Sequence, residues 1–201
     1  MACTRLFGLP ISMGRLTNLT ELDLRETKLV TPPKVVQAWE TEDILDYLAR
    51  YDEADRNGVL DLVDIGLAAI PVEVTDLTGL TELSLAGNTI AELPNDFAYL
   101  SNLVDINLDR NRIQNLPMFM MHFTNLTSLS MNQNGMAVLP SIVCNITSLT
   151  ELGLAHNKLL YLPPKLGINS NLVHLHIEGN NLRCPPTEIA TKSVAATIAW
   201  Q

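Results

Sequence analysis

The sequence has little cysteine and no long apolar run, and both shortages narrow the class of protein. Its three cysteines, Cys3, Cys144 and Cys184, are an odd count without the paired clusters that often close secreted repeat arrays. The first ten residues have no apolar stretch long enough for a signal peptide. No run approaches the roughly 20 apolar residues of a membrane-spanning helix. We therefore expect a reduced, cytoplasmic protein without a membrane span.

Basic residues are also scarce. The chain has 13 lysines and arginines against 22 aspartates and glutamates, which gives a net charge of -9. This balance argues against nucleic acid as a ligand, because such binding depends on cations that neutralise phosphates. An acidic surface instead favours a basic protein partner, or serves solubility alone.

Catalytic motifs are missing as well. The sequence contains no nucleophile elbow, no phosphate-binding loop and no H-E-x-x-H zinc motif. Its many carboxylates fall at positions that a repeat pattern leaves exposed. The sequence thus predicts that the chain is not an enzyme and uses no cofactor.

A 23-residue repeat occupies most of the chain, with the pattern L-x-x-L-x-L-x-x-N-x-L-x-x-L-P. In one copy, Ile106 and Leu108 are two apart and share one face of a short strand, while Asn107 faces the other way. One unit cannot bury its apolar side alone, but stacked copies bury one another. This predicts an α/β solenoid with short parallel strands. The copies begin at Leu80, Leu103, Leu126, Leu149 and Leu172.

One asparagine per repeat falls among the inward apolar positions. A buried amide must be hydrogen-bonded, so we expect these side chains to bridge the turn backbones of neighbouring repeats. The predicted ladder consists of Asn88, Asn111, Asn134, Asn157 and Asn180.

The pattern resembles that of leucine-rich-repeat proteins, and the form L-P-x-x-(apolar)-x-x-L-x-N-L is similar to the intracellular Ras-suppressor and Scribble type. The resemblance implies a horseshoe whose strands line the concave face. It also implies a non-enzymatic protein–protein interaction scaffold in intracellular signalling. The implied partner is a small GTPase or another signalling protein. The acidic net charge of this chain further suggests that the partner presents a basic surface.

The period breaks between Leu29 and Leu60, where we predict a helix over Trp39–Tyr51 with Thr41 as its N-cap. Much of this phrase returns at the C-terminus, where Pro185, Pro186 and Trp200 take the places of Pro32, Pro33 and Tyr47. It resembles a helical element that closes such arrays, so we predict one cap used twice. The predicted segments are a short repeat segment starting in mid-repeat (1–36), a helical insertion (37–56), the main array (57–183) and a cap-like segment (184–201).

The outward strand face is the predicted binding surface. Glu82 and Asp105 occupy equivalent positions in adjacent repeats, and like charges on neighbouring strands destabilise a sheet. This favours a basic ligand that offsets them, and a merely solvated face is the alternative. The face lacks Trp, Tyr and Phe, which argues against a tight site because aromatic residues dominate binding hot spots. The candidate partner-binding residues are Glu82, Asp105, Asn107, Asp109, Arg110, Asn132, Glu151, His174 and His176.

Two further possibilities stay open as alternatives. On the convex side, Met118, Phe119 and Met121, with Ile142 one repeat later, form either an apolar patch or local packing. The start in mid-repeat and the stop at Gln201 suggest a recognition domain of a larger signalling enzyme, such as a kinase, GTPase or ubiquitin ligase.

Two metal motifs occur in approximate form. Residues 53–64 approximate an EF-hand loop, but Leu60 and Leu62 are needed inward by the repeat, so a strand follows rather than a second helix. His156, His174 and His176 face outward with Glu151 close by, which suits zinc but also suits a ligand-binding strand. We predict no metal.

Overall fold

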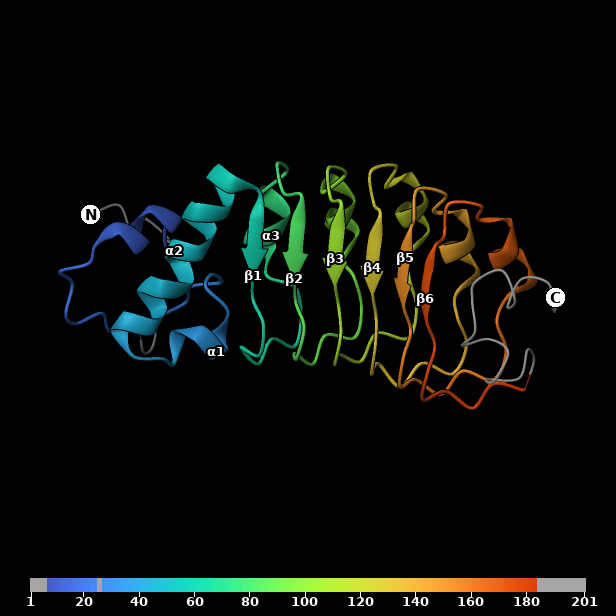
Figure 1. Ribbon diagram of the computed structural model, residues 1–201. Helices are drawn as coiled ribbons and strands as arrows, with labels where there is room; N and C mark the ends of the chain where they lie inside the picture. Colours follow the sequence, from blue (N-terminus) through green and yellow to red (C-terminus); the bar gives the residue numbers. More distant parts are fainter. Residues whose placement is uncertain (1–6, 25–26, 184–201) are drawn as a thin grey trace.

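The computed structural model describes residues 7–24 and 27–183 and forms one elongated array (Figure 1). The predicted C-terminal cap over residues 184–201 lies outside the described residues. Six strands form one sheet in sequence order, all neighbours parallel, which confirms the predicted α/β solenoid. The strands are β1 (Val59–Asp61), β2 (Glu82–Ser84), β3 (Asp105–Asn107), β4 (Ser128–Ser130), β5 (Glu151–Gly153) and β6 (His174–His176).

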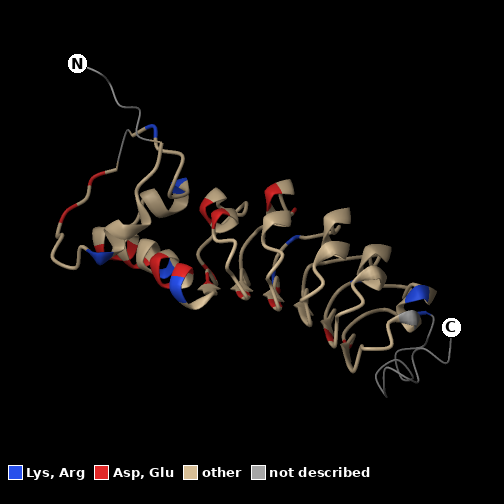
Figure 2. Ribbon diagram, turned by 90° about the horizontal axis from the view of Figure 1, so that it is seen from above, with Lys and Arg blue, Asp and Glu red and all other residues tan. Residues whose placement is uncertain are grey.

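Each strand is only three residues long, and each of β1–β5 pairs with the equivalent residues of the next strand, 23 positions further on. The middle residue points into the core, so Leu83, Ile106 and Leu129 are almost fully buried. The flanking residues of these strands are exposed or half-buried on the opposite face. The sheet follows the inner side of a shallow curve, and short helices follow the outer side (Figure 2).

A proline precedes each helix on the outer side, where the missing N–H is harmless because the first turn of a helix leaves it unbonded. The helices are α3 (Val72–Asp76), η2 (Asn95–Tyr99), η3 (Met118–His122), η4 (Ser141–Asn145) and η5 (Pro164–Ile168). Phe119 is half-buried against the core and Ile142 is buried, while Met118 and Met121 remain exposed. Of the two interpretations of this convex region, local packing therefore describes Phe119 and Ile142.

The asparagines of the ladder are all buried and hydrogen-bonded to backbone groups. Asn111 shows the arrangement: its Oδ1 accepts from Ile90 N–H of the preceding repeat at 3.0 Å, and its Nδ2 donates to the carbonyl of Leu85 at 2.8 Å. Nδ2 also bonds the carbonyl of Leu108 in its own repeat, at 3.1 Å. Each asparagine thus joins its own turn to the turn before it.

Before the sheet, the chain forms η1 (Ile11–Arg15), α1 (Lys34–Gln37) and α2 (Thr41–Asn57). Helix α2 continues six residues beyond the predicted end and stops at Gly58, whose φ of 76° is left-handed. The predicted N-cap is wrong: Glu40 occupies that position, and Thr41 Oγ1 instead accepts from Leu22 N–H at 2.8 Å. This bond ties the preceding segment to the start of α2.

Helix α2 closes the first edge of the sheet. Ile44, Tyr47, Leu48 and Tyr51 are buried, and the helix packs against η1, α1 and β1. On β1, the carbonyl of Asp61 accepts from Arg50 of α2 at 3.3 Å. No strand of the sheet precedes β1 within residues 7–24 and 27–58, so the described part of the first repeat segment packs beside the sheet without extending it.

An ion pair joins the N-terminal segment to α2. Arg15 donates two hydrogen bonds to Asp52, at 2.9 and 2.6 Å, and Arg56 adds a third at 3.1 Å. Only 10% of the Asp52 side chain is exposed. Hydrogen bonding from Arg15 and the charges of both arginines lower the pKa of Asp52, and burial opposes this shift.

Candidate interaction surface

The concave face carries two rows of outward side chains. The first row runs through Glu82, Asp105 and Glu151, and the second through Asp61 and Asn107. Register places Glu82 and Asp105 directly opposite each other on β2 and β3, as the repeat pattern implies. Acidic residues recur along the strand side of the array (Figure 2).

Acidic side chains concentrate at the β1–β3 end of this face. Asp61, Glu82 and Asp105 line a shallow hollow of about 250 Å³. None of the three makes an ion pair with another described residue. Carboxylates held side by side without cations repel one another, so this end of the face is complementary to positive charge.

Two of the predicted binding residues serve the array itself. Asp109 Oδ1 accepts from Ser130 Oγ at 2.6 Å and from Asn132 N–H at 2.7 Å, and Asp109 Oδ2 accepts from Asn132 Nδ2 at 3.0 Å. Asn132 Oδ1 in turn accepts from Ala155 N–H at 2.6 Å. This network spans three repeats, so Asp109 and Asn132 are less available to a partner than Glu82 and Asp105.

Arg110 reaches across one repeat to Asp64, at 3.1 Å. Gly87 lies between them, and a Cβ there would collide with the Asp64 carboxylate and approach Arg110 Nη2 at 3.1 Å. The absence of a side chain at Gly87 thus permits the pair. Arg110 itself has a left-handed backbone, φ 54°, as do Asp64, Gln133 and His156.

The histidines lie at the far end of the face. The backbones of Glu151 and His174 are in register, as the spacing predicts, but it is His176 Nε2 that lies 3.2 Å from Glu151 Oε1. Within residues 7–24 and 27–183, no group of three or more histidine, cysteine, aspartate and glutamate side chains is placed to hold a metal ion. This end of the face therefore differs in chemistry from the β1–β3 end.

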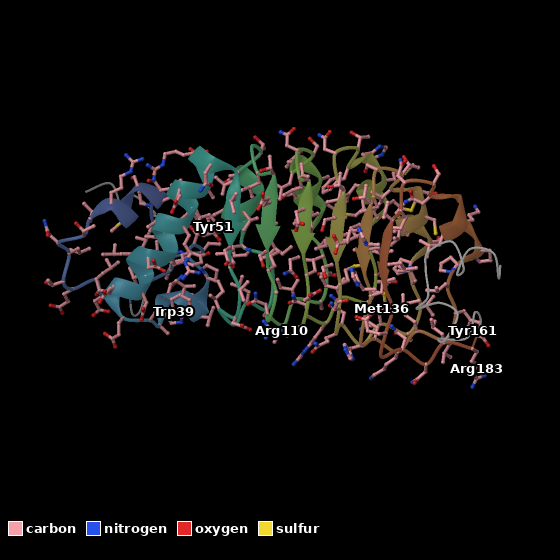
Figure 3. The ribbon with its side chains drawn as sticks, in the orientation of Figure 1. Trp39, Tyr51, Arg110, Met136, Tyr161 and Arg183 are labelled. Carbon is pink, nitrogen blue, oxygen red and sulfur yellow. The ribbon has the colours of Figure 1, made fainter. Side chains whose placement is uncertain are left out.

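Sequence reasoning missed the groove where α2 meets the first repeat of the sheet, the repeat that contains β1. A hollow of about 490 Å³ lies there, and its wall includes Trp39, Arg50 and Asp64. Trp39 lies just before the helix and near its first turn (Figure 3). The tryptophan was visible in the sequence, but only the packing of α2 beside β1 brings it next to the sheet.

Known structures share this architecture. Residues 78–136 match the family model for the leucine rich repeat. A leucine-rich-repeat protein of Leptospira interrogans aligns with a TM-score of 0.66 at 28% identity, covering 96% of this chain and 45% of that one. No match was found among curated protein sequences.

Two plant receptors align as well. The peptide hormone receptor RGFR1, solved in complex with RGF2, has a TM-score of 0.51 at 28% identity and covers 62% of this chain and 21% of its own. The leucine-rich-repeat ectodomain of the Arabidopsis thaliana receptor kinase GASSHO1/SCHENGEN3, in complex with CASPARIAN STRIP INTEGRITY FACTOR 2, has a TM-score of 0.55 at 28% identity, with coverage of 64% and 16%.

The parallel sheet, the turn repeated in each unit and the asparagine ladder define a repeat solenoid of the class that binds other proteins. The chain has a leucine-rich-repeat solenoid fold. It spans less than half the length of the solved relatives described above. The Ras-suppressor and Scribble subtype stays a prediction. Among the described residues, no helix is long and apolar enough to cross a membrane.

Proposed function

We propose that this chain is a non-enzymatic protein–protein interaction scaffold of cytoplasmic signalling that binds a basic partner surface through the concave face. The observation that carries the proposal is the set of carboxylates Asp61, Glu82 and Asp105 on three adjacent strands, none of which forms an ion pair with another described residue. A small GTPase or another signalling protein with a basic surface is the partner that the family resemblance favours.

A selection from random peptides tests the proposal and needs no identified partner. Displayed 12-residue peptides are selected on the intact chain and then assayed on the double variant Glu82→Lys and Asp105→Lys. We expect selected peptides rich in lysine and arginine, with binding at least about tenfold weaker on the variant and a larger difference at low salt.

The matched control is Glu92→Lys with Asp96→Lys. It makes the same change in net charge at exposed positions outside the strands. Peptides that bind wild type and both variants equally would contradict a concave acidic site.

A second candidate is that the array recognises partners on behalf of a larger signalling enzyme, such as a kinase, GTPase or ubiquitin ligase. One solved relative is the ectodomain of a receptor kinase, and this chain covers 16% of that ectodomain chain. The complete reading frame of the transcript decides between the two: a catalytic domain in it favours this candidate, and a frame of repeats and caps alone excludes it.

A further inference from the structure

The groove between α2 and the first repeat is a feature that the concave strands do not account for. Its hollow of about 490 Å³ is lined by Trp39, Asp43, Asp46, Arg50, Asp64 and Ile65. The wall thus combines an aromatic ring with three carboxylates and one guanidinium. The volume is ample for a long side chain of a partner.

The three carboxylates of this groove differ in the ion pairs and hydrogen bonds that they form within the protein. Asp46 accepts two hydrogen bonds from Arg50, at 3.0 and 2.8 Å, and Asp64 pairs with Arg110 at 3.1 Å. The Asp43 side chain is exposed and forms no ion pair or hydrogen bond with the other described residues. One carboxylate of the groove is therefore left for a cation that the described residues do not supply.

Trp39 provides the second element of a cation site. It is half-buried, and its ring is held by Tyr47 in an edge-to-face contact with 6.3 Å between ring centroids and 85° between ring planes. A tryptophan ring attracts a cation over its face, most often a guanidinium. The planar guanidinium also stacks on the ring and forms paired hydrogen bonds with a carboxylate, which an ammonium does not.

The groove continues into the acidic concave face. Arg50 lines the groove and also donates to the carbonyl of Asp61 at 3.3 Å. Asp61 lies on the wall of the next hollow together with Glu82 and Asp105. Arg50, whose guanidinium is paired with Asp46, therefore links the two hollows, and a single extended peptide can reach from one to the other.

We infer that this groove is a pocket for an arginine side chain at one end of an extended basic peptide segment. In it, Trp39 stacks on the guanidinium and Asp43 neutralises it. The other cations of the segment follow Asp61, Glu82 and Asp105 across β1–β3. The inference rests on the proposed function, because it names the chemistry of the partner and the place of its arginine end on that same surface.

Two synthetic ten-residue peptides probe the pocket. One alternates arginine with glycine or serine, and the other carries neutral citrulline in place of each arginine. Each is titrated into the ¹⁵N-labelled chain while the tryptophan indole N–H signals are followed, with Trp39→Phe used to assign the signal of Trp39. We expect the arginine peptide to shift the Trp39 signal and the citrulline peptide to leave it in place.

Asp43→Asn removes the free carboxylate at an exposed position, so the fold is kept. It should weaken binding of the arginine peptide about three- to fivefold. The matched control Asp55→Asn removes the same charge from an exposed position of α2 that does not line the groove. It should leave the affinity within a factor of about two.

The outcomes separate this inference from the proposed function. An unshifted Trp39 signal, together with binding that is lost in Glu82→Lys/Asp105→Lys and kept in Asp43→Asn, would overturn the pocket and leave the concave site intact. A shifted Trp39 signal with affinity unchanged by Glu82→Lys/Asp105→Lys would support the pocket and contradict the concave site. Equal shifts from a third peptide of the same design, with lysine in place of each arginine, would overturn the choice of arginine.

Discussion

Asn111 shows how one buried side chain joins two repeats. Its Oδ1 takes up Ile90 N–H and its Nδ2 the carbonyl of Leu85, both in the preceding repeat. These backbone groups are buried, and an unpaired buried polar group is costly. Ile65 stands at the equivalent place in the first repeat, where no ladder turn of the sheet precedes it. The apolar residue is therefore tolerated at that end of the ladder.

Replacing Asn111 with Ala should lower the free energy of unfolding by about 2 kcal/mol, because the buried Ile90 N–H loses its partner at about 1–3 kcal/mol. The carbonyls of Leu85 and Leu108 also lose a bond from Asn111, but each keeps one, from Asn88 and Asn134. Urea unfolding followed by circular dichroism measures the change. Asn115→Ala, at an exposed position of the same repeat, is the control and should change stability by less than about 0.5 kcal/mol. Equal losses in the two variants would remove the ladder as a source of stability.

The repeat pattern predicts which side chains point outward better than it predicts which of them are free to bind a partner. The alternation in the repeat places Asp109, Asn132 and Glu82 outward, and the structure agrees. However, Asp109 and Asn132 already bond each other across adjacent repeats. Such bonds join residues 23 positions apart and depend on side-chain geometry that a linear pattern does not contain.

At the scale of elements, the strands of the repeats could be predicted from the sequence. The helical insertion at residues 37–56 could be predicted only in part. A strand of this array is required wherever two apolar residues separated by one position recur with a period of 23, because stacking buries both of them. Helix α2 follows apolar spacing, but its C-terminal end depends on the left-handed Gly58. The contact of Trp39 with the first repeat depends on how α2 docks, which no local pattern specifies.

Helix α2 should be required for the stability of the first repeats. Replacing both Leu45 and Leu48 with Asp places carboxylates at positions that are 6% and 2% exposed, and should cost several kcal/mol, roughly 3 or more. Light scattering should also reveal aggregation, since β1 loses the cover on its free edge. Limited proteolysis of wild type should find residues 41–57 resistant.

A milder substitution tests the same prediction in case the double variant does not fold. Leu48→Ala should cost about 2–4 kcal/mol through the cavity it leaves, while Glu53→Ala on the exposed side of α2 should be nearly neutral. Rapid cleavage of wild type within residues 41–57 would indicate a linker instead of a cap.

The whole molecule is a linear array in which each strand pairs only with its neighbours. Stability in such arrays is a sum of repeat and neighbour terms, so the attachment of the end segments matters. At the N-terminal end, the bonds of Arg15 to Asp52 connect η1 to α2, which in turn covers β1. This attachment follows from contacts between residues 37 positions apart, and the 23-residue period does not predict it.

Acid should weaken this attachment. Asp52 has a lowered pKa in the folded chain because Arg15 donates hydrogen bonds to it, so the unfolded state takes up the proton first as pH falls. The stabilisation is therefore complete above the unfolded value of about 4 and is lost as pH falls through the lower folded pKa. Urea midpoints measured between about pH 6 and pH 3 should fall more steeply for wild type than for Asp52→Asn. Arg15→Gln should flatten the profile in the same way, and Asp55→Asn, exposed on the same helix, should keep the wild-type slope. A wild-type slope in Asp52→Asn would show that other carboxylates govern the acid response of the array.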